Sequence, residues 1–342
     1  MVGLKLKERE LKNILLLTGV ACAVFSLSLI GISIILRLNI VEVFGYFFTF
    51  TLGSEFGILS VLRRTTYLLI VSLGLCVAFR SGVWNLGGEG QILLGSLAAV
   101  GICLEIGLSP IIVIPLAFAS SFLVGGGWGL LAGVLKAKFG VNEMIVTMMM
   151  NFVATATMIE LAGGPWRDPF VLIAETRMIA PELRFPFIVY PLNTVFLIAL
   201  VLIPVVYVLV EKTVLGYKMR VVGGSIAAAT YAGISPGRVI MLCMFLSGGI
   251  CALAGATLVF GHFFSAGTGI SGMYGFYAIV CTLLGGTKPK MMFFTSLLIA
   301  FILTGTNALR ALGIPGGFAD VMIGLMFVMA ALPELLARRR SK

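Results

Sequence analysis

Long apolar runs separated by short polar segments form the dominant pattern along this chain. Ten runs can be compared with a membrane-spanning helix, which needs about 20 mostly apolar residues. The second and the eighth run are shorter, so each is expected to be a half-span or to be extended by flanking residues. The pattern predicts an all-α polytopic membrane protein with about ten (eight to ten) transmembrane helices. The runs cover residues 14–36, 65–79, 91–108, 110–135, 143–162, 191–210, 238–260, 275–286, 291–309 and 317–336.

The composition agrees with this pattern and excludes a soluble globular domain. Of the 342 residues, 60% are hydrophobic and 11% are charged, and the mean hydropathy is +1.12. The net charge of +10 does not indicate nucleic-acid binding, because the basic residues stand in ones and twos between apolar runs, as orientation signals do. With the amino terminus placed inside, only 7 of the 24 Lys and Arg residues fall outside, which predicts that both termini are cytoplasmic. The seven are Arg37, Arg63, Arg64, Arg167, Arg177, Arg184 and Arg310.

Residues that could support catalysis or metal binding are scarce. All six cysteines fall inside apolar segments and form no CxxC pair, and His262 is the single histidine. Residues 269–272 fit the short GxSG pattern of rhomboid proteases, but His262 precedes the serine, whereas that family's histidine lies on a later helix. No GxxxxGK[ST] sequence is present. We therefore expect no enzyme activity, no metal site and no cofactor on this chain.

A polar, structured segment at 211–238 interrupts the apolar runs. Ser225 can cap a short helix over residues 226–232, and Gly233 can end that helix in the left-handed conformation. A capped helix with basic residues on both sides predicts a docking element for another protein. The alternative is an interfacial helix that lies on the membrane surface.

The remaining polar segments complete the expected layout of a single membrane domain over residues 1–342. The longest, 163–190, has mixed charge and is expected on the outer face, and the aromatic-rich piece at 39–62 is expected to lie along the membrane interface. The tails at 1–13 and 337–342 are expected in the cytoplasm.

The spans also suggest an internal symmetry. Ten spans divide into two sets of five, and an odd number per half gives the second half the opposite orientation, as in many transporters with inverted repeats. Each half then has a Gly-rich break after its second span, at 81–90 and 265–275. Because glycine weakens helices and permits close backbone approach, we expect both breaks to border a translocation path. The alternative is that they are tight connecting turns.

A stripe of polar residues at intervals of four lies along the run that begins at Asn142. This spacing puts the stripe on one face of a helix. Such a face lines a pore or packs against another helix, because an acidic group at mid-depth costs about 2.5 to 3.5 kcal/mol unless it is solvated. We expect the stripe to line the path; alternatively, the threonines bond to their own helix and the asparagine joins two helices. The stripe is Glu143, Thr147, Asn151 and Thr155.

A second polar group lies at the first Gly-rich break and contains Trp84, Asn85, Glu89 and Gln91. These side chains offer hydrogen bonds and one aromatic face, which would suit a polar, ring-shaped solute. They could instead cap helix ends. Asp320, near the start of the last run, is interpreted as a charge favoured by the helix dipole.

Four segments have distinctive sequences: FRSGVWNLGGEGQILLGSLAA at 79–99, NEMIVTMMMNFVA at 142–154, GYKMRVVG at 216–223 with AATYAGI after it, and LLGGTKPK at 283–290. With them, nearly the whole chain resembles the membrane permeases of bacterial and archaeal ABC importers for simple sugars and nucleosides, related to the ribose and branched-chain amino-acid permeases. The sequence at 84–91 is most similar to that of the nucleoside branch, which typically uses two different permease chains.

The resemblance implies a permease pair in the prokaryotic cytoplasmic membrane, two cytoplasmic ATPase subunits that bind ATP, and an external solute-binding lipoprotein. The capped helix after Ser225 then resembles a coupling helix, with Ala227, Ala228, Ala229 and Gly233 at the family's positions. The family pattern opens with glutamate where this chain has Ala227. An acidic first-turn group contributes only about 0.3 to 1 kcal/mol to a helix, so the segment is expected to fold while a salt bridge to the ATPase is lost.

Two alternatives to a nucleoside importer are carried forward from the sequence. One is a permease of the same class for a simple sugar such as ribose or another pentose or hexose. The other is a stand-alone secondary transporter coupled to sodium or protons. Such transporters normally place an ionisable residue or an unwound carbonyl cluster at mid-membrane, whereas the acids here lie near predicted helix ends.

Overall fold

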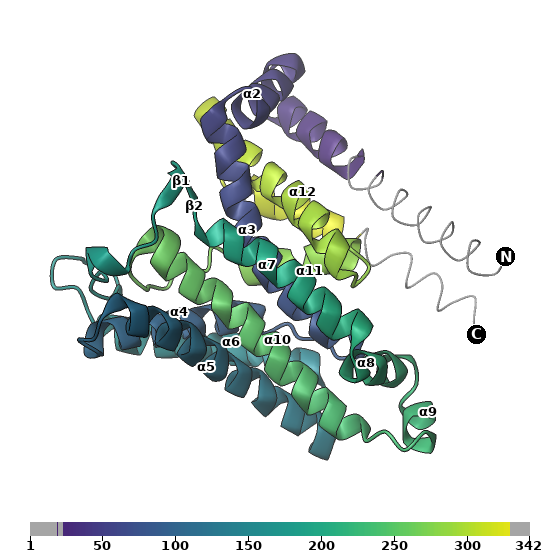
Figure 1. Cartoon of the computed structure of the whole chain (residues 1–342). Helices are drawn as coiled ribbons and strands as arrows, with labels where there is room; N and C mark the ends of the chain where they lie inside the picture. The colour runs from purple at the N-terminus through teal and green to yellow at the C-terminus, as the bar shows by residue number, and fades with distance from the viewer. Residues whose placement is uncertain (1–18, 20–22, 329–342) are drawn as a thin grey trace.

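The structure is a computed structural model that describes residue 19 and residues 23–328 (Figure 1). The predicted tails at 1–13 and 337–342, and parts of the first and last apolar runs, lie outside the described residues. The helices are α2 (Ile40–Leu52), α3 (Glu55–Arg80), α4 (Gly88–Glu105), α5 (Pro110–Phe139), α6 (Glu143–Gly163), α7 (Val195–Tyr207), α8 (Val214–Gly224), α9 (Ile226–Tyr231), α10 (Pro236–Leu258), α11 (Tyr274–Leu284) and α12 (Pro289–Ala308).

Shorter elements complete the described part of the chain. Single π or 3-10 turns are η1 (Pro181–Leu183), η2 (Val208–Lys212), η3 (Val259–Phe263) and η4 (Leu309–Leu312), and the strands β1 (Phe187–Val189) and β2 (Leu192–Asn193) form an antiparallel hairpin. Two further apolar helical stretches are Ala23–Ile35 and Phe318–Val328.

Within the described residues, seven helices are long and apolar enough to cross a membrane: α3, α4, α5, α6, α7 with η2, α10 with η3, and α12 with η4. Four shorter apolar helices accompany them, namely Ala23–Ile35, α2, α11 and Phe318–Val328. The predicted helical, polytopic membrane fold is confirmed, but ten full spans are not found in this part of the chain. The eighth predicted run corresponds to α11, which is also short, with 11 residues.

The second predicted run is extended by flanking residues at its amino-terminal end, which is one of the two outcomes expected for it. Instead of covering 65–79, the helix α3 has 26 residues, so Arg63 and Arg64 lie inside it rather than in an outer loop. Hydropathy ends the run at these two charges, but a helix can continue through an arginine whose side chain finds a partner. The Nη1 atom of Arg63 lies 3.0 Å from Nε2 of His262 in η3.

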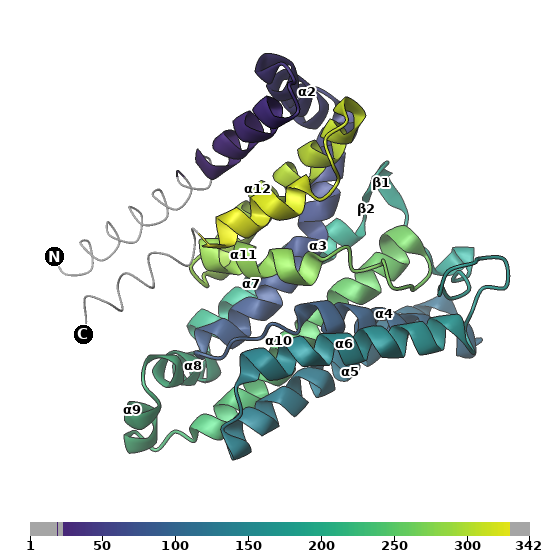
Figure 2. The same ribbon diagram turned by 180° about the vertical axis from the view of Figure 1, so that it is seen from behind.

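The two halves of the chain exchange their long central helices. α3, from the first half, packs against α11 and α12, whereas α10, from the second half, packs against α4 and α5. Figures 1 and 2 show both groups, with α7 and α3 lying between α12 and the α4–α6 layer. This reciprocal packing is what two repeats of opposite direction would produce.

Close backbone contact holds α10 against α4. A Cβ atom added at Gly255 would lie 2.1 Å from the carbonyl oxygen of Ile92, and one added at Gly95 would lie 2.2 Å from that of Ala252. Both distances are far below van der Waals contact. Glycine is therefore required on both helices, as at the small-residue crossings of membrane helices.

The polar segment 163–190 folds over the second Gly-rich break. The Thr176 N–H donates to the carbonyl oxygen of Ala266 at 2.9 Å, and the Ala266 N–H donates to Thr176 Oγ1 at 2.9 Å. The Ser265 hydroxyl also donates to the Glu175 carboxylate at 2.6 Å. These bonds tie the break to the predicted outer segment, and they explain how an irregular backbone remains hydrogen-bonded there.

Candidate functional site

The two Gly-rich breaks meet each other in the structure. Glu89, in the first turn of α4, accepts a hydrogen bond at Oε2 from the N–H of Gly275 in the first turn of α11, at 2.9 Å. A Cβ atom at Gly275 would lie 2.2 Å from the Glu89 backbone nitrogen, so the backbones approach as closely as glycine permits. The first N–H groups of a helix have no intrahelical partner, and a carboxylate there is favoured by the helix dipole. Glu89 thus joins the start of α4 to the start of α11.

The polar stripe on α6 holds the first break from the other side. The Leu86 N–H donates to Thr147 Oγ1 at 3.1 Å, and the Leu86 carbonyl oxygen accepts from Asn151 Nδ2 at 2.9 Å. Asn151 Oδ1 also accepts from the Gly90 N–H at 2.9 Å. The non-helical segment before α4 therefore obtains from α6 the backbone partners that a helix would have supplied itself.

Glu143, at the start of the same stripe, has two partners of its own. Its carboxylate forms an ion pair with Lys136 Nζ at 2.9 Å, which ties the end of α5 to the start of α6. Its second oxygen lies 3.5 Å from the Trp84 N–H. Thr155 bonds back to the Asn151 carbonyl oxygen at 3.0 Å.

The amides of Asn85 and Gln91 form a small buried ladder. Asn85 Nδ2 donates to Gln91 Oε1 at 3.1 Å and to Ser247 Oγ on α10 at 2.9 Å. Asn85 Oδ1 also accepts from the Gly87 N–H at 2.9 Å. The break is thereby joined to α10 as well as to α6.

All six side chains expected on the substrate path are therefore buried and bonded within the chain: Asn85, Glu89, Gln91, Glu143, Thr147 and Asn151. Their contacts match the second interpretation of the sequence, in which they join helices and cap helix ends. That they border the path remains a prediction, and in this arrangement their direct effect is to fix the backbone of the first break.

A cavity of about 290 Å³ opens beside the point where the breaks meet. It is mainly apolar, and its polar feature is a hydrogen bond from the Tyr277 hydroxyl on α11 to Asp320 Oδ1. Leu86 of the first break and Met273 of the second both line it. Sequence reasoning did not find Tyr277, because nothing in the pattern pairs it with an acid 43 residues away. The further lining residues include Met148, Phe276, Ile323 and Phe327.

The predicted capped helix is present as α9. Ser225 Oγ accepts from the Ala228 N–H at 3.2 Å, and Gly233 has a φ of +72°, so both predicted ends are confirmed. In Figures 1 and 2, α9 projects beyond the packed helices, next to α8. The residues of its outer surface are exposed, with Tyr231 94% exposed, while Ala229 is buried. The preceding helix α8 was missed, since its run is too short and mixed to stand out.

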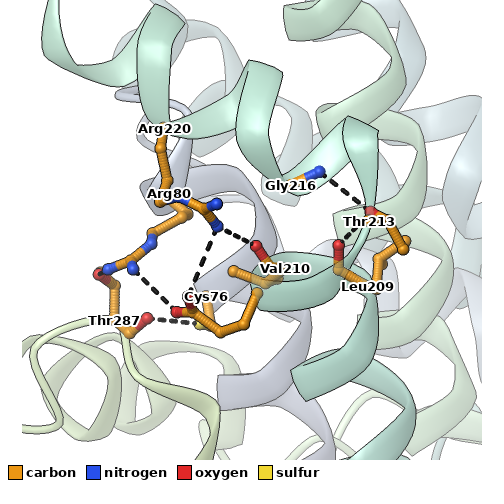
Figure 3. A network of polar contacts seen from close by, with 9 residues as sticks. Cys76, Arg80, Leu209, Val210, Thr213, Gly216, Arg220 and Thr287 are labelled. Atoms are coloured by element: carbon orange, nitrogen blue, oxygen red, sulfur yellow. Dashed lines mark hydrogen bonds and ion pairs between the residues drawn. The ribbon is translucent and has the colours of Figure 1, made fainter.

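An ion-pair network anchors α8 to the end of α3 (Figure 3). Arg80 Nη2 lies 2.8 Å from Glu211 Oε1, and Arg220 Nη1 on α8 lies 3.5 Å from Glu211 Oε2. Arg220 also donates to the Val210 carbonyl oxygen at 2.5 Å. The side chains of Arg80, Glu211 and Arg220 are 22%, 28% and 34% exposed, respectively, so their charges are partly shielded from water.

The same network reaches the loop between α11 and α12. Arg80 Nη1 donates to Thr287 Oγ1 at 3.4 Å, and the Cys76 thiol lies 3.1 Å from the Thr287 carbonyl oxygen. At the far end of α8, a Cβ atom on Gly223 would lie 2.6 Å from the Arg80 carbonyl oxygen. The helix α8 is therefore in contact with the residues that lead into the first break, and Arg80 links it to those that follow α11.

Comparison with known proteins identifies the relatives of this chain. The model of the branched-chain amino acid transport system / permease component family matches residues 57–331. The glucose ABC transporter permease protein TsgB13 of Haloferax volcanii is 27% identical over 337 residues, covering 94% of this chain and 89% of that protein. The guanosine ABC transporter permease protein NupP of Bacillus subtilis is 31% identical over 289 residues, covering 82% of each.

A third relative, the nucleoside ABC transporter permease protein NupB of Lactococcus lactis, is 27% identical over 324 residues, covering 90% of this chain and 88% of that protein. No solved structure gives a significant match. The family model covers most of the chain, from the start of α3 onward, and the relatives cover more than four fifths of it. The chain therefore belongs to the branched-chain amino acid transport system / permease component family, whose members are transport permeases of the membrane.

Proposed function

We propose that this chain forms the translocation path of an ATP-driven ABC importer for a nucleoside. The observation that carries the substrate class is the 31% identity to the guanosine permease NupP over 82% of both chains. The similarity to the nucleoside permease NupB supports the same class. The importer would lie in the cytoplasmic membrane with both termini inside, and ATP would be bound by separate ATPase subunits. A second permease chain and an external solute-binding lipoprotein would complete it.

The helix α9 is the proposed contact with the ATPase. It is short, capped and exposed, and its apolar Ile226 and Tyr231 side chains are 57% and 94% exposed, respectively. Exposed apolar groups at a projecting tip favour burial in a partner's groove. Ala227 supplies no charge there, so this contact would rest on shape and apolar area.

Movement of α9 would reach the path through the contacts already described. Arg80, Glu211 and Arg220 tie α8 to α3, and Thr287 ties the same cluster to the loop after α11. The first break begins directly after Arg80, and the second break ends where α11 begins. A rigid shift of α9 on ATP binding would thus change the relation between α4 and α11, which gives the two-state element that alternating access needs.

A simple sugar is the second candidate substrate, because the glucose permease TsgB13 matches the larger share of this chain. The same fold, docking helix and cavity would serve either solute.

Reconstitution separates these possibilities. The tagged chain would be purified with whatever subunits accompany it, placed in lipid vesicles, and assayed for uptake of labelled guanosine, glucose and ribose with and without ATP. We expect an ATPase and a second permease to co-purify and guanosine uptake to require ATP. If only a sugar were taken up, the substrate would be a sugar rather than a nucleoside. If the chain alone carried out uptake without ATP, it would be a secondary transporter rather than an importer subunit.

A further inference from the structure

Two arginines inside α3 form no ion pair with an acidic residue in the described part of the chain. The ion pairs within residues 23–328 join Arg80 or Arg220 to Glu211 and Lys136 to Glu143, and none of them involves Arg63 or Arg64. Charged residues inside membrane helices are costly, and they usually mark a site that serves function. Arg63 is positioned by His262, whose ring nitrogens lie 3.0 and 3.3 Å from its Nη1 atom.

Both arginines line a pocket of about 340 Å³ between α2, α3 and the end of α12. The polar side chains in its wall are those of Ser60, Arg63, Arg64, Thr304 and Asn307, together with the hydroxyl of Tyr46. The two arginines can only donate hydrogen bonds, the other groups can donate or accept, and the described lining contains no Asp or Glu. The electrostatics of the pocket therefore favour an anion.

Two buried polar atoms in this wall have no hydrogen-bond partner among the residues that the structure describes. The hydroxyl of Ser60 is one of them, on a residue that is only 4% exposed, and Nε of Arg64 is the other. Leaving such groups unpaired destabilises a structure, and buried polar groups in proteins are nearly always hydrogen-bonded. An anionic group with several oxygen atoms offers the acceptors that an arginine N–H and a serine hydroxyl require.

The rim of the pocket indicates where that anion comes from. Tyr46 on α2 is 38% exposed, and Phe56 on α3 is 48% exposed. The same end of α2 exposes further apolar residues, among them Phe48 and Leu52. Aromatic residues around a cationic pocket at the end of membrane helices are typical of the level of lipid headgroups.

We propose that this pocket binds the phosphate group of an anionic phospholipid, with Arg64 and Ser60 as its main ligands and Arg63 as a second cation. The lipid bridges α2 to α3 and α12. Loss of the lipid therefore loosens the packing of α2 on the rest of the chain. This site is separate from the cavity beside Tyr277. Lipid binding there does not depend on which solute the permease carries.

The proposal is tested on the full chain, purified with its accompanying subunits and stripped of lipid in detergent. Short-chain phosphatidylglycerol, phosphatidylcholine and inorganic phosphate would each be titrated, with bound lipid counted by native mass spectrometry and melting temperature followed in parallel. Phosphatidylglycerol is expected to bind and to raise the melting temperature. Arg64→Gln is expected to weaken its apparent affinity about fivefold, the effect of one arginine at a headgroup.

Arg177→Gln is the matched control, because Arg177 is an exposed arginine of the outer segment, and it should bind phosphatidylglycerol like the wild type. If Arg64→Gln does not fold, Ser60→Ala tests the same wall with a smaller change and should also weaken binding about fivefold. Equal affinity of both pocket variants and the wild type would overturn the proposal. So would equal binding of phosphatidylcholine, or binding of inorganic phosphate alone.

Discussion

Replacement of Gly275 by alanine tests the contact between the two Gly-rich breaks. The added Cβ would lie 2.2 Å from the backbone nitrogen of Glu89 and 2.5 Å from its Cα. Both are backbone atoms at the start of a helix, so neither can move without moving α4. The same shift would strain the hydrogen bond from Gly275 to the Glu89 carboxylate.

The expected cost follows from two opposing terms. Overpacking in a tight core destabilises by about 1 to 3 kcal/mol, and contact with backbone atoms favours the upper end of that range. Alanine in a helix is about 1 kcal/mol better than glycine, which offsets part of this cost. The net destabilisation is about 2 kcal/mol, which for a chain of this size lowers the melting temperature by about 3 °C.

The assay is thermal unfolding of the purified permease in detergent, with solute uptake in vesicles measured alongside. Gly269→Ala, in the same break, is the control, because no described neighbour lies within 4 Å of a Cβ at Gly269. The control should melt within about 1 °C of the wild type, since such substitutions change stability by less than about 0.5 kcal/mol. If Gly275→Ala melted at the wild-type temperature and transported normally, the close contact of the breaks would be refuted.

Three further predictions concern transport and stability. Glu211→Gln removes the anion shared by Arg80 and Arg220, so ATP-driven uptake should fall at least tenfold while membrane abundance stays within twofold on a quantitative blot; unchanged uptake would show that the network does not transmit movement. Gly233→Arg should abolish uptake and ATPase co-purification, because arginine is strained at a φ of +72° beside α9, whereas normal uptake at normal abundance would exclude docking there. Asn151→Leu leaves the Gly90 N–H and the Leu86 carbonyl unpaired and should destabilise by about 2 kcal/mol or more in thermal unfolding, with Thr157→Val on the exposed face of α6 as the neutral control.

Much of the fold could be predicted because membrane helices are encoded locally. The apolar runs at 91–108, 110–135 and 143–162 correspond to α4, α5 and α6, whose lengths follow from the thickness of the membrane. The cap at Ser225 and the glycine at 233 located α9, since capping is a short-range interaction. The predicted run was shorter than α3, because hydropathy counts every arginine against a span even when its side chain has a partner far away in the sequence.

The candidate site was harder to predict, because its contacts join residues far apart in sequence. The spacing of four correctly placed Thr147 and Asn151 on one face of α6, but it could not show that the face meets the backbone of Leu86. The pairs Glu89 with Gly275 and Tyr277 with Asp320 cross from one half to the other or between separate helices. Local periodicity contains no information about such pairs.

The exchange of α3 and α10 between the halves has a consequence for the biogenesis of this protein. When the ribosome has completed α6, the groove of α4 and α5 that receives α10 is still empty, and α3 still lacks α11 and α12. Neither half can bury its own helices alone, so the nascent first half must wait in the membrane until the second half is inserted. A chain cut between α6 and α7 should thus yield two fragments that are degraded when expressed singly and are rescued by co-expression.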